Sequence, residues 1–126
     1  MKIKCISLLQ PYAWAVAMNL KPLETRTWAT KYRGPLLIAA SKRFHQPHYD
    51  YLRSIGIQLP KKEDFEYGKI IAKTNLVDCV VFTKELEQYA LCPVYPGFGL
   101  WLKDTKMLER PVPVKGMLGL YDVEWT

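Results

Sequence analysis

The alternation of residue types between Leu23 and Trp28 places the strongest constraint on how this chain folds. Glu24, Arg26 and Trp28 take every second position, and the residues between them are uncharged. A period of two is that of a β-strand, in which successive side chains point to opposite faces of the sheet. This strand therefore presents Glu24, Arg26 and Trp28 on one face, with Lys21 at its mouth. A carboxylate, a guanidinium, an ammonium and an indole gathered on one face indicate a binding surface.

Other short segments show strand or helix patterns separated by turns rich in Gly and Pro. Helices are predicted over residues 12–18, 45–55 and 84–90. Strands are predicted over residues 2–8, 36–40, 69–82, 97–102 and 118–125. The segment 69–82 exceeds the usual strand length, and Thr74-Asn75 within it predicts a bend or a bulge. The prolines of residues 110–116 predict an extended connector and exclude a central strand there. Together these elements predict an α+β domain built around a small, curved mixed β-sheet or β-barrel.

Length and composition limit the class of protein. With 126 residues the chain can form one core and is too short for two, so we expect a single domain over residues 1–126. Its apolar runs are too short to span a bilayer, and the N-terminus has no signal-peptide pattern, so we expect a cytoplasmic protein without a membrane partner. Cys5, Cys79 and Cys92 are widely spaced and form no Cys-x-x-Cys pair, which predicts reduced cysteines.

The net charge of +6 and the sequence pI of about 9.2 suit a polyanionic partner. An aromatic content of 13% adds rings on which bases can stack. Composition alone leaves two alternatives about equally weighted, a nucleic-acid or nucleotide binder and a small basic protein that binds neither.

The polar strand face has two interpretations. If it lines a cleft, its side chains lie roughly 7 Å apart, so one small planar ligand can touch two of them. Alternatively it is a solvated face with a weak ion pair, worth less than about 1 kcal/mol. The opposite face offers only Leu23, Thr25 and Thr27, which would make a poor core, and this favours the cleft.

Asp78 shares its predicted strand face with apolar residues such as Val80. A buried carboxylate requires a cation or several backbone donors, so Lys21, Arg26 or Lys42 is its expected partner. The alternative is an Asp that caps a neighbouring turn. Lys42 follows an apolar strand directly and belongs to the site only if that strand delivers it to the cleft.

Two further clusters call for interpretation. His45 and His48 have no cysteine or carboxylate at ligand spacing, so we expect helix-start histidines and no metal or other cofactor. Residues 95–101 bring Tyr95, Phe98 and Trp101 together with two glycines. Such a loop can form a stacking wall for a base, although aromatics at this density are more often part of a core.

The chain resembles the ASCH domain family in segments that run over almost its whole length. These segments are Ser7–Ala13 with its Gln-Pro, Lys21-x-x-Glu24-x-Arg26-x-Trp28, Tyr32–Lys42 with its Tyr-Arg-Gly, Gly68–Asp78 and Lys115–Val123. The usual family pattern has a glycine two residues before the position of Lys21, as Gly-x-Lys, and Asn19 stands here in place of that glycine. Asn is the mildest replacement at a left-handed helix end.

This resemblance implies a PUA-like fold, which is a small β-barrel with flanking helices and a cleft on one side. It also implies an RNA-related role. Some small ASCH proteins are amidohydrolases that remove the acetyl group from N4-acetylcytidine, and their first catalytic lysine matches Lys21. The family's catalytic threonine falls at Glu24 in this chain. Its catalytic glutamate lies after the long central strand, where Glu85 or Glu87 is only a loose match.

The leading hypothesis from the sequence is an ASCH module that binds RNA or a nucleotide-like ligand in a basic cleft. In this hypothesis the cations contact phosphates, the carboxylates orient the cations, and the aromatic rings stack on bases. The alternative is a hydrolase that acts on a modified nucleoside with Lys21 and Glu24 as catalytic residues. A module that binds only protein ranks last, and the oligomeric state is left open. The predicted binding residues are Lys21, Glu24, Arg26, Trp28, Tyr32, Arg33, Lys42, Asp78 and Trp101.

Overall fold

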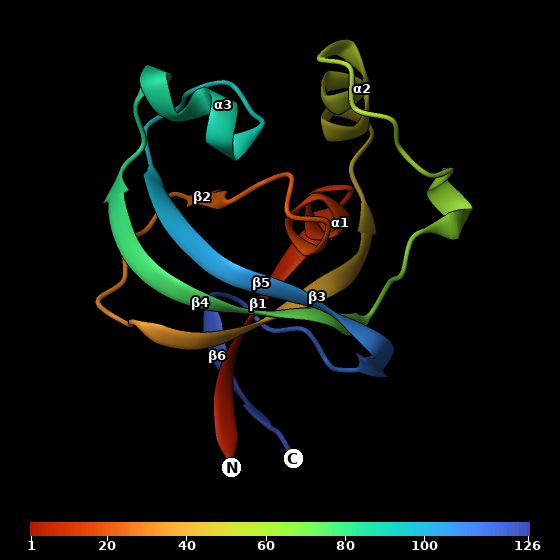
Figure 1. Cartoon of the computed structure of the whole chain (residues 1–126), viewed down its shortest axis with the longest axis vertical. Helices are drawn as coiled ribbons and strands as arrows, with labels where there is room; N and C mark the ends of the chain where they lie inside the picture. The colour runs from red at the N-terminus through yellow and green to blue at the C-terminus, as the bar shows by residue number, and fades with distance from the viewer.

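A computed structural model describes all 126 residues as one mixed, six-stranded β-sheet with three short α-helices (Figure 1). The strands are β1 (Lys2–Gln10), β2 (Leu23–Arg26), β3 (Gly34–Phe44), β4 (Lys69–Val81), β5 (Phe98–Pro113) and β6 (Leu120–Glu124). The helices are α1 (Tyr12–Ala17), α2 (Gln46–Ser54) and α3 (Glu87–Ala90), with 3-10 turns at Lys62–Asp64 and Lys84–Leu86. The predicted α+β class is confirmed.

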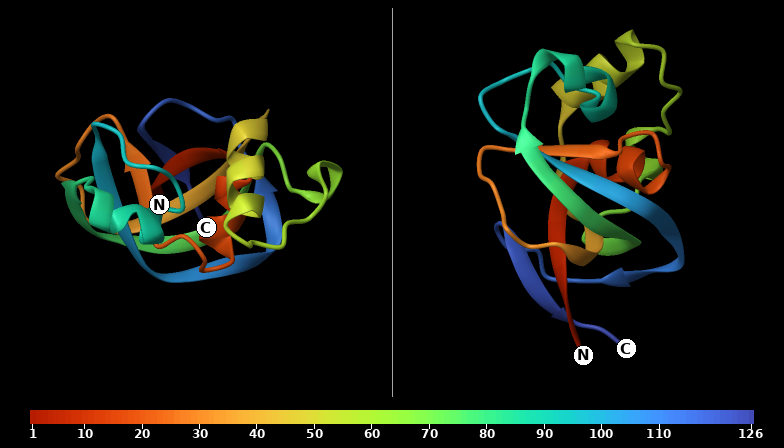
Figure 2. Two further views of the ribbon diagram at one scale, coloured as in Figure 1. Left: turned by 90° about the horizontal axis from the view of Figure 1, so that it is seen from above. Right: turned by 60° about the vertical axis from the view of Figure 1, so that its left-hand side comes forward.

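The strand order is β2-β5-β4-β3-β1-β6, in which only β1 and β3 run parallel. Figure 2 shows how strongly β4 and β5 curve, and the views place α2 and α3 at one end of the molecule and both termini at the other. The two outermost strands, β2 and β6, do not pair with each other. The expected barrel is therefore wrong in one respect: the sheet curls but stays open, because β2 is only four residues long and pairs with β5 alone.

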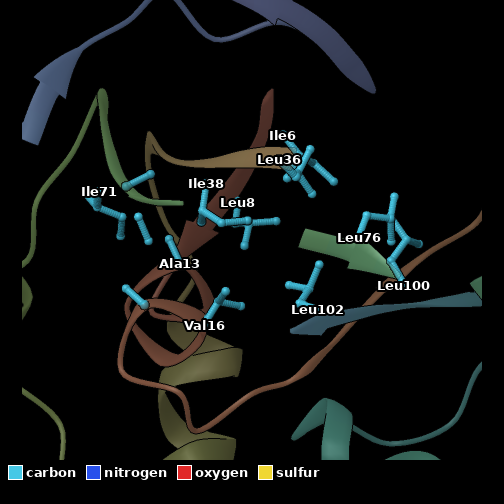
Figure 3. Close-up of a cluster of buried hydrophobic side chains, with 13 residues drawn as sticks. Ile6, Leu8, Ala13, Val16, Leu36, Ile38, Ile71, Leu76, Leu100 and Leu102 are labelled. Atoms are coloured by element: carbon cyan, nitrogen blue, oxygen red, sulfur yellow. The ribbon is translucent and has the colours of Figure 1, made fainter. Parts of the chain in front are cut away.

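The main core lies between the concave side of the sheet and α1. Alternate apolar side chains of four strands meet Ala13, Val16 and Ala17 of this helix, and all are buried (Figure 3). Gln10 secures the helix start, since its side-chain oxygen accepts a hydrogen bond from the Trp14 N–H at 2.9 Å. Asn19 follows the helix with φ of 61°, which confirms the left-handed stop predicted for it.

A second cluster of buried residues surrounds Leu23, which is fully buried among Tyr12, Leu52 and Phe82. The expectation that this face of β2 would make a poor core is therefore wrong for Leu23, because α2 and the segment around α3 cover it. The predicted strand also ends two residues early, at Arg26, and Trp28 lies in the bend that follows. Trp28 consequently does not share a strand face with Glu24 and Arg26.

Bulges in the β4–β5 pair decide which side chains face the core. The bend predicted at Thr74-Asn75 is confirmed as a register shift, and the one extra residue lies on β5, where Asp104 has φ of 57°. A second shift falls between Leu76 and Asp78. It reverses the alternation, so Asp78 is exposed. Its predicted place on a core face is wrong, and it caps no turn either, because its carboxylate accepts the N–H of Cys79, the next residue of the same strand, at 2.8 Å.

The connector predicted over residues 110–116 is strand as far as Pro113. Ile70 and Lys69 of β4 pair with Val112 and Pro113, whereas β2 reaches β5 only between Phe98 and Trp101. The proline-containing half of β5 is therefore an edge, where a missing N–H leaves no ladder bond unmade. This half of β5 is not a central strand, as the prolines predict.

Candidate functional site

A cleft with a volume of about 1500 Å³ opens on one side of the molecule. It lies where the sheet fails to close, between β2, the end of β1, the start of α2 and the loops on either side. Its polar and aromatic lining residues include Ser7, Tyr12, Glu24, Thr25, Arg26, Thr27, Lys42, Arg43, His48, Tyr51, Tyr95 and Lys115.

Arg26 spans the gap between β2 and the end of β1. Its Nη2 donates to the Ser7 carbonyl oxygen of β1 at 2.8 Å, and its Nε donates to Glu24 Oε2 at 2.8 Å. β1 pairs with β6 only as far as Ile6, so the Ser7 carbonyl lies at an edge that β6 does not cover. The guanidinium is thus fixed at two of its three nitrogens, which leaves Nη1 to donate to a ligand.

Glu24 lies between two cations. Besides Arg26, the Lys21 ammonium approaches its Oε1 at 3.8 Å, and the carboxylate is almost completely buried. A carboxylate with this degree of burial is stabilised by its cations and holds them in place in return. The predicted grouping of Lys21, Glu24 and Arg26 is therefore present in the structure.

Lys21 is not at the mouth of this grouping, because its side chain is only 1% exposed and does not line the cleft. Its Nζ donates to the Leu23 carbonyl at 3.0 Å and to the Ala90 carbonyl, and lies 4.4 Å from the centre of the Tyr12 ring. Burial lowers the pKa of Lys21, while the Glu24 carboxylate opposes that shift. In this setting the lysine ties β2 to the end of α3.

The charge on the cleft wall is strongly unbalanced. Arg26, Lys42, Arg43 and Lys115 line it, and Glu24 is the only carboxylate among the lining residues. Lys42 reaches the cleft because β3 continues to Phe44, four residues beyond the predicted end. Since Glu24 is already paired, the cations give the wall a net positive field that attracts anions.

Aromatic rings form much of the remaining wall. Tyr12 and His48 stack at 4.2 Å between ring centroids, and the Tyr12 hydroxyl donates to the Leu91 carbonyl at 3.0 Å. Burial and the nearby His45 lower the pKa of His48 to about 4, so its imidazole is neutral at pH 7. Tyr51 and Tyr95 complete the set of rings.

Sequence reasoning did not select several of these lining residues. Tyr12 follows the Gln-Pro element and Lys115 begins the last segment that resembles the ASCH family. Both residues therefore belong to motifs that could have indicated them. Arg43 and Tyr51 carried no local signal, because only the path of β3 and α2 brings them to the cleft.

The other predicted residues lie outside the cleft. Trp28 and Tyr32 pack against the main core, and Trp101 packs against the second cluster with Tyr89 at 5.3 Å between rings. Arg33 and Asp78 form an exposed ion pair at 3.6 Å. Trp28 keeps one contact with the predicted grouping, since the Arg26 guanidinium carbon lies 6.0 Å from the centre of its ring, whereas the positions of the other four residues give no support to their predicted roles.

The two loosely matched glutamates also lie away from the cleft. Glu85 is exposed, and the Glu87 carboxylate accepts the Val94 N–H at 2.6 Å. No group of three or more His, Cys, Asp or Glu side chains is placed to hold a metal ion. None of the helices is long and apolar enough to cross a membrane.

A sequence model of the ASCH domain matches residues 6–118, which is most of the chain. This chain belongs to the ASCH domain family. Human and mouse activating signal cointegrator 1 are each 30% identical to it over 68% of its length. The match covers only 16% of those relatives, so the ASCH domain corresponds to a small part of much longer proteins.

Solved structures show the same fold. The ASCH protein of Zymomonas mobilis superimposes with a TM-score of 0.64 at 14% identity, over 96% of this chain and 87% of that one. A mutant form of the same protein gives a TM-score of 0.63 at 14% identity, over 96% of this chain and 89% of that one. At this identity the likeness concerns the architecture of the ASCH domain and not its ligand.

Proposed function

We propose that this ASCH domain binds RNA or a nucleotide-like ligand in its basic cleft and acts in RNA metabolism or regulation. The observation that carries the proposal is the charge of the cleft wall, where four cations face a single carboxylate that is already paired with Lys21 and Arg26. Such a wall attracts phosphates. The rings of Tyr51 and Tyr95 supply surfaces on which bases stack.

The cleft residues divide between two tasks. Lys42, Arg43 and Lys115 make no ion pair with an acidic residue, so each can contact a phosphate without losing an internal partner. Arg26 is fixed by Glu24 and Ser7 and contacts a ligand through Nη1. Lys21 acts on the ligand indirectly, because it holds Glu24 and therefore Arg26 in place.

No observation favours the amidohydrolase alternative. Catalysis by Lys21 would require its Nζ to reach a substrate, yet the ammonium is buried beneath Tyr12 and bonded to two carbonyl groups. Incubation with N4-acetylcytidine, with release of cytidine as the readout, tests this alternative directly. Release that is lost in a Lys21→Ala protein shown by circular dichroism to be folded would establish the hydrolase.

The binding proposal is tested by fluorescence anisotropy with labelled single-stranded RNA hexamers at several salt concentrations. Lys42→Ala, Arg43→Ala and Lys115→Ala should each weaken binding, and each should reduce the slope of log K against log salt by about 0.7 per lost phosphate contact. Lys73→Ala and Lys106→Ala are matched controls, since these exposed lysines lie outside the cleft. No binding at low salt, or equal losses in both sets of variants, would refute the proposal.

A further inference from the structure

The cleft faces the unpaired edge of β2. This strand is the last of the sheet and pairs with β5 on one side only. Three consecutive residues of the strand, Glu24 to Arg26, line the cleft, although successive side chains of a strand point to opposite faces. A surface that touches both faces of a strand lies along its edge. Backbone groups of β2, and not only side chains, therefore border the cleft.

The hydrogen bonds of β2 identify which backbone groups lie at this edge. Leu102 N–H donates to the Pro22 carbonyl at 2.9 Å. Because bonded and non-bonded pairs alternate in an antiparallel ladder, Glu24 and Arg26 bond to β5 and Thr25 does not. The Leu23 carbonyl fits this alternation, since it accepts Lys21 Nζ instead. The N–H and C=O of Thr25 therefore point away from β5, toward the edge that lines the cleft.

The groups around Thr25 suit a planar ring. Tyr95 and Thr25 both line the cleft, and the Tyr95 ring is fixed by an edge contact with Phe82 at 5.5 Å between ring centroids. Arg26, the next residue, also lines the cleft and has Nη1 as a further donor. Cys92 Sγ lies 3.7 Å from Thr25 Oγ1 and closes one side. The edge thus combines a donor, an acceptor and an aromatic face in one place.

We propose that the Thr25 backbone recognises the hydrogen-bonding edge of an unpaired nucleobase, with the Tyr95 ring against the face of that base. This inference rests on the RNA-binding function proposed above. The Watson–Crick edges of adenine, cytosine and uracil each place a donor beside an acceptor, which complements the N–H and C=O of one strand residue. A base-paired nucleotide hides this edge, so the domain selects single-stranded RNA over a duplex.

Two substitutions at one position separate the backbone from the side chain. Thr25→Pro removes the N–H that the base would use, and proline is tolerated on an edge strand where the N–H faces outward. Thr25→Ala keeps both backbone groups. We expect Thr25→Pro to lower the affinity for single-stranded RNA hexamers at least tenfold and clearly more than Thr25→Ala does, with melting temperatures measured for both.

NMR on the unmodified protein decides the question even if Thr25→Pro does not fold. Titration of ¹⁵N-labelled protein with r(A)6, r(C)6 and r(U)6 should shift the Thr25 amide and protect it from exchange. A hexamer of 3-methyluridine, which has the same charge but lacks the N3–H donor, should bind at least tenfold more weakly than r(U)6.

The outcomes distinguish the two proposals. RNA that binds without perturbing the Thr25 amide, with Thr25→Pro equal to Thr25→Ala, overturns the nucleobase inference and leaves the binding function standing. If no hexamer binds, both fail. A Thr25 shift produced by an extended Glu-Val repeat peptide and by no RNA would make β2 a peptide-docking strand and also overturn the inference.

Discussion

Arg26 links the edge strand β2 to Ser7 near the end of β1, since Arg26 Nη2 donates to the Ser7 carbonyl at 2.8 Å. The sheet is not closed at this point by strand pairing, so a single side chain makes the connection. The geometry of the cleft therefore depends on Arg26 and on Glu24, which orients it.

Arg26→Lys should destabilise the domain by about 1–2 kcal/mol, because an ammonium cannot bond Glu24 and the Ser7 carbonyl with the planar geometry of a guanidinium. The free energy of unfolding in urea measures the loss. Arg33→Lys is the matched control, since Arg33 is exposed and should change that free energy by less than about 0.5 kcal/mol. Equal effects of the two substitutions would contradict the role assigned to Arg26.

Lys21→Met should destabilise the domain by about 3 kcal/mol. The thioether fills a similar volume but leaves the Leu23 and Ala90 carbonyls without their donor and removes one cation from buried Glu24. Urea unfolding again gives the free energy. The exposed Lys84 provides the comparison as Lys84→Met, for which no significant change is expected. A Lys21→Met protein as stable as the parent would show that the buried ammonium is dispensable.

Gly97→Ala should destabilise the domain by about 2–3 kcal/mol, because the new Cβ would lie 2.6 Å from the Arg26 carbonyl oxygen and 2.9 Å from the Tyr95 ring. The backbone cannot yield there without moving β2. The resonance of Arg26 Nε–H should therefore shift in an NMR spectrum of this variant.

Gly56→Ala is the control for this substitution. Gly56 has φ of +91° and no atom within 4 Å of a new Cβ, so its substitution strains only the local backbone. It should leave the Arg26 Nε–H resonance unchanged. A shift of that resonance in both variants would argue against a specific contact at Gly97.

His48 should make stability depend on pH. Burial and His45 lower its pKa from 6.5 to about 4, so the unfolded chain binds the proton more readily than the folded domain. Its contribution is therefore complete above about pH 6.5 and is lost as the pH falls toward 4. His48→Phe keeps the ring beside Tyr12 and cannot titrate.

Urea unfolding between pH 4 and pH 7 compares the two proteins. The unfolding free energy of the parent should fall more steeply below pH 6.5 than that of His48→Phe. The carboxylates contribute equally to the two curves of unfolding free energy against pH. Parallel curves would therefore show that His48 is not responsible for the pH dependence.

Much of the secondary structure and part of the site follow from local pattern. The alternation around Glu24 and Arg26 predicts a polar strand, Asn19 predicts the end of α1, and Thr74-Asn75 predicts a bulged region. These features depend on neighbours within a few residues, where sterics and side-chain period act directly. The sequence also identifies the ASCH family, because several short motifs occur together and each has its residues at a fixed spacing.

The tertiary structure decided which side of each element faces the core and which groups meet. A bulge of one residue turned Asp78 outward, and the covering of Leu23 by distant segments gave β2 a buried face. Lys21 lies inside because Ala90, 69 residues later, supplies its acceptor. Such outcomes depend on the register of strand pairing and on long-range packing. A periodicity of two tells which side chains share a face of a strand, but not which face is buried. The sequence determined that charges would gather at β2; the open edge of the sheet determined which of them reach the cleft.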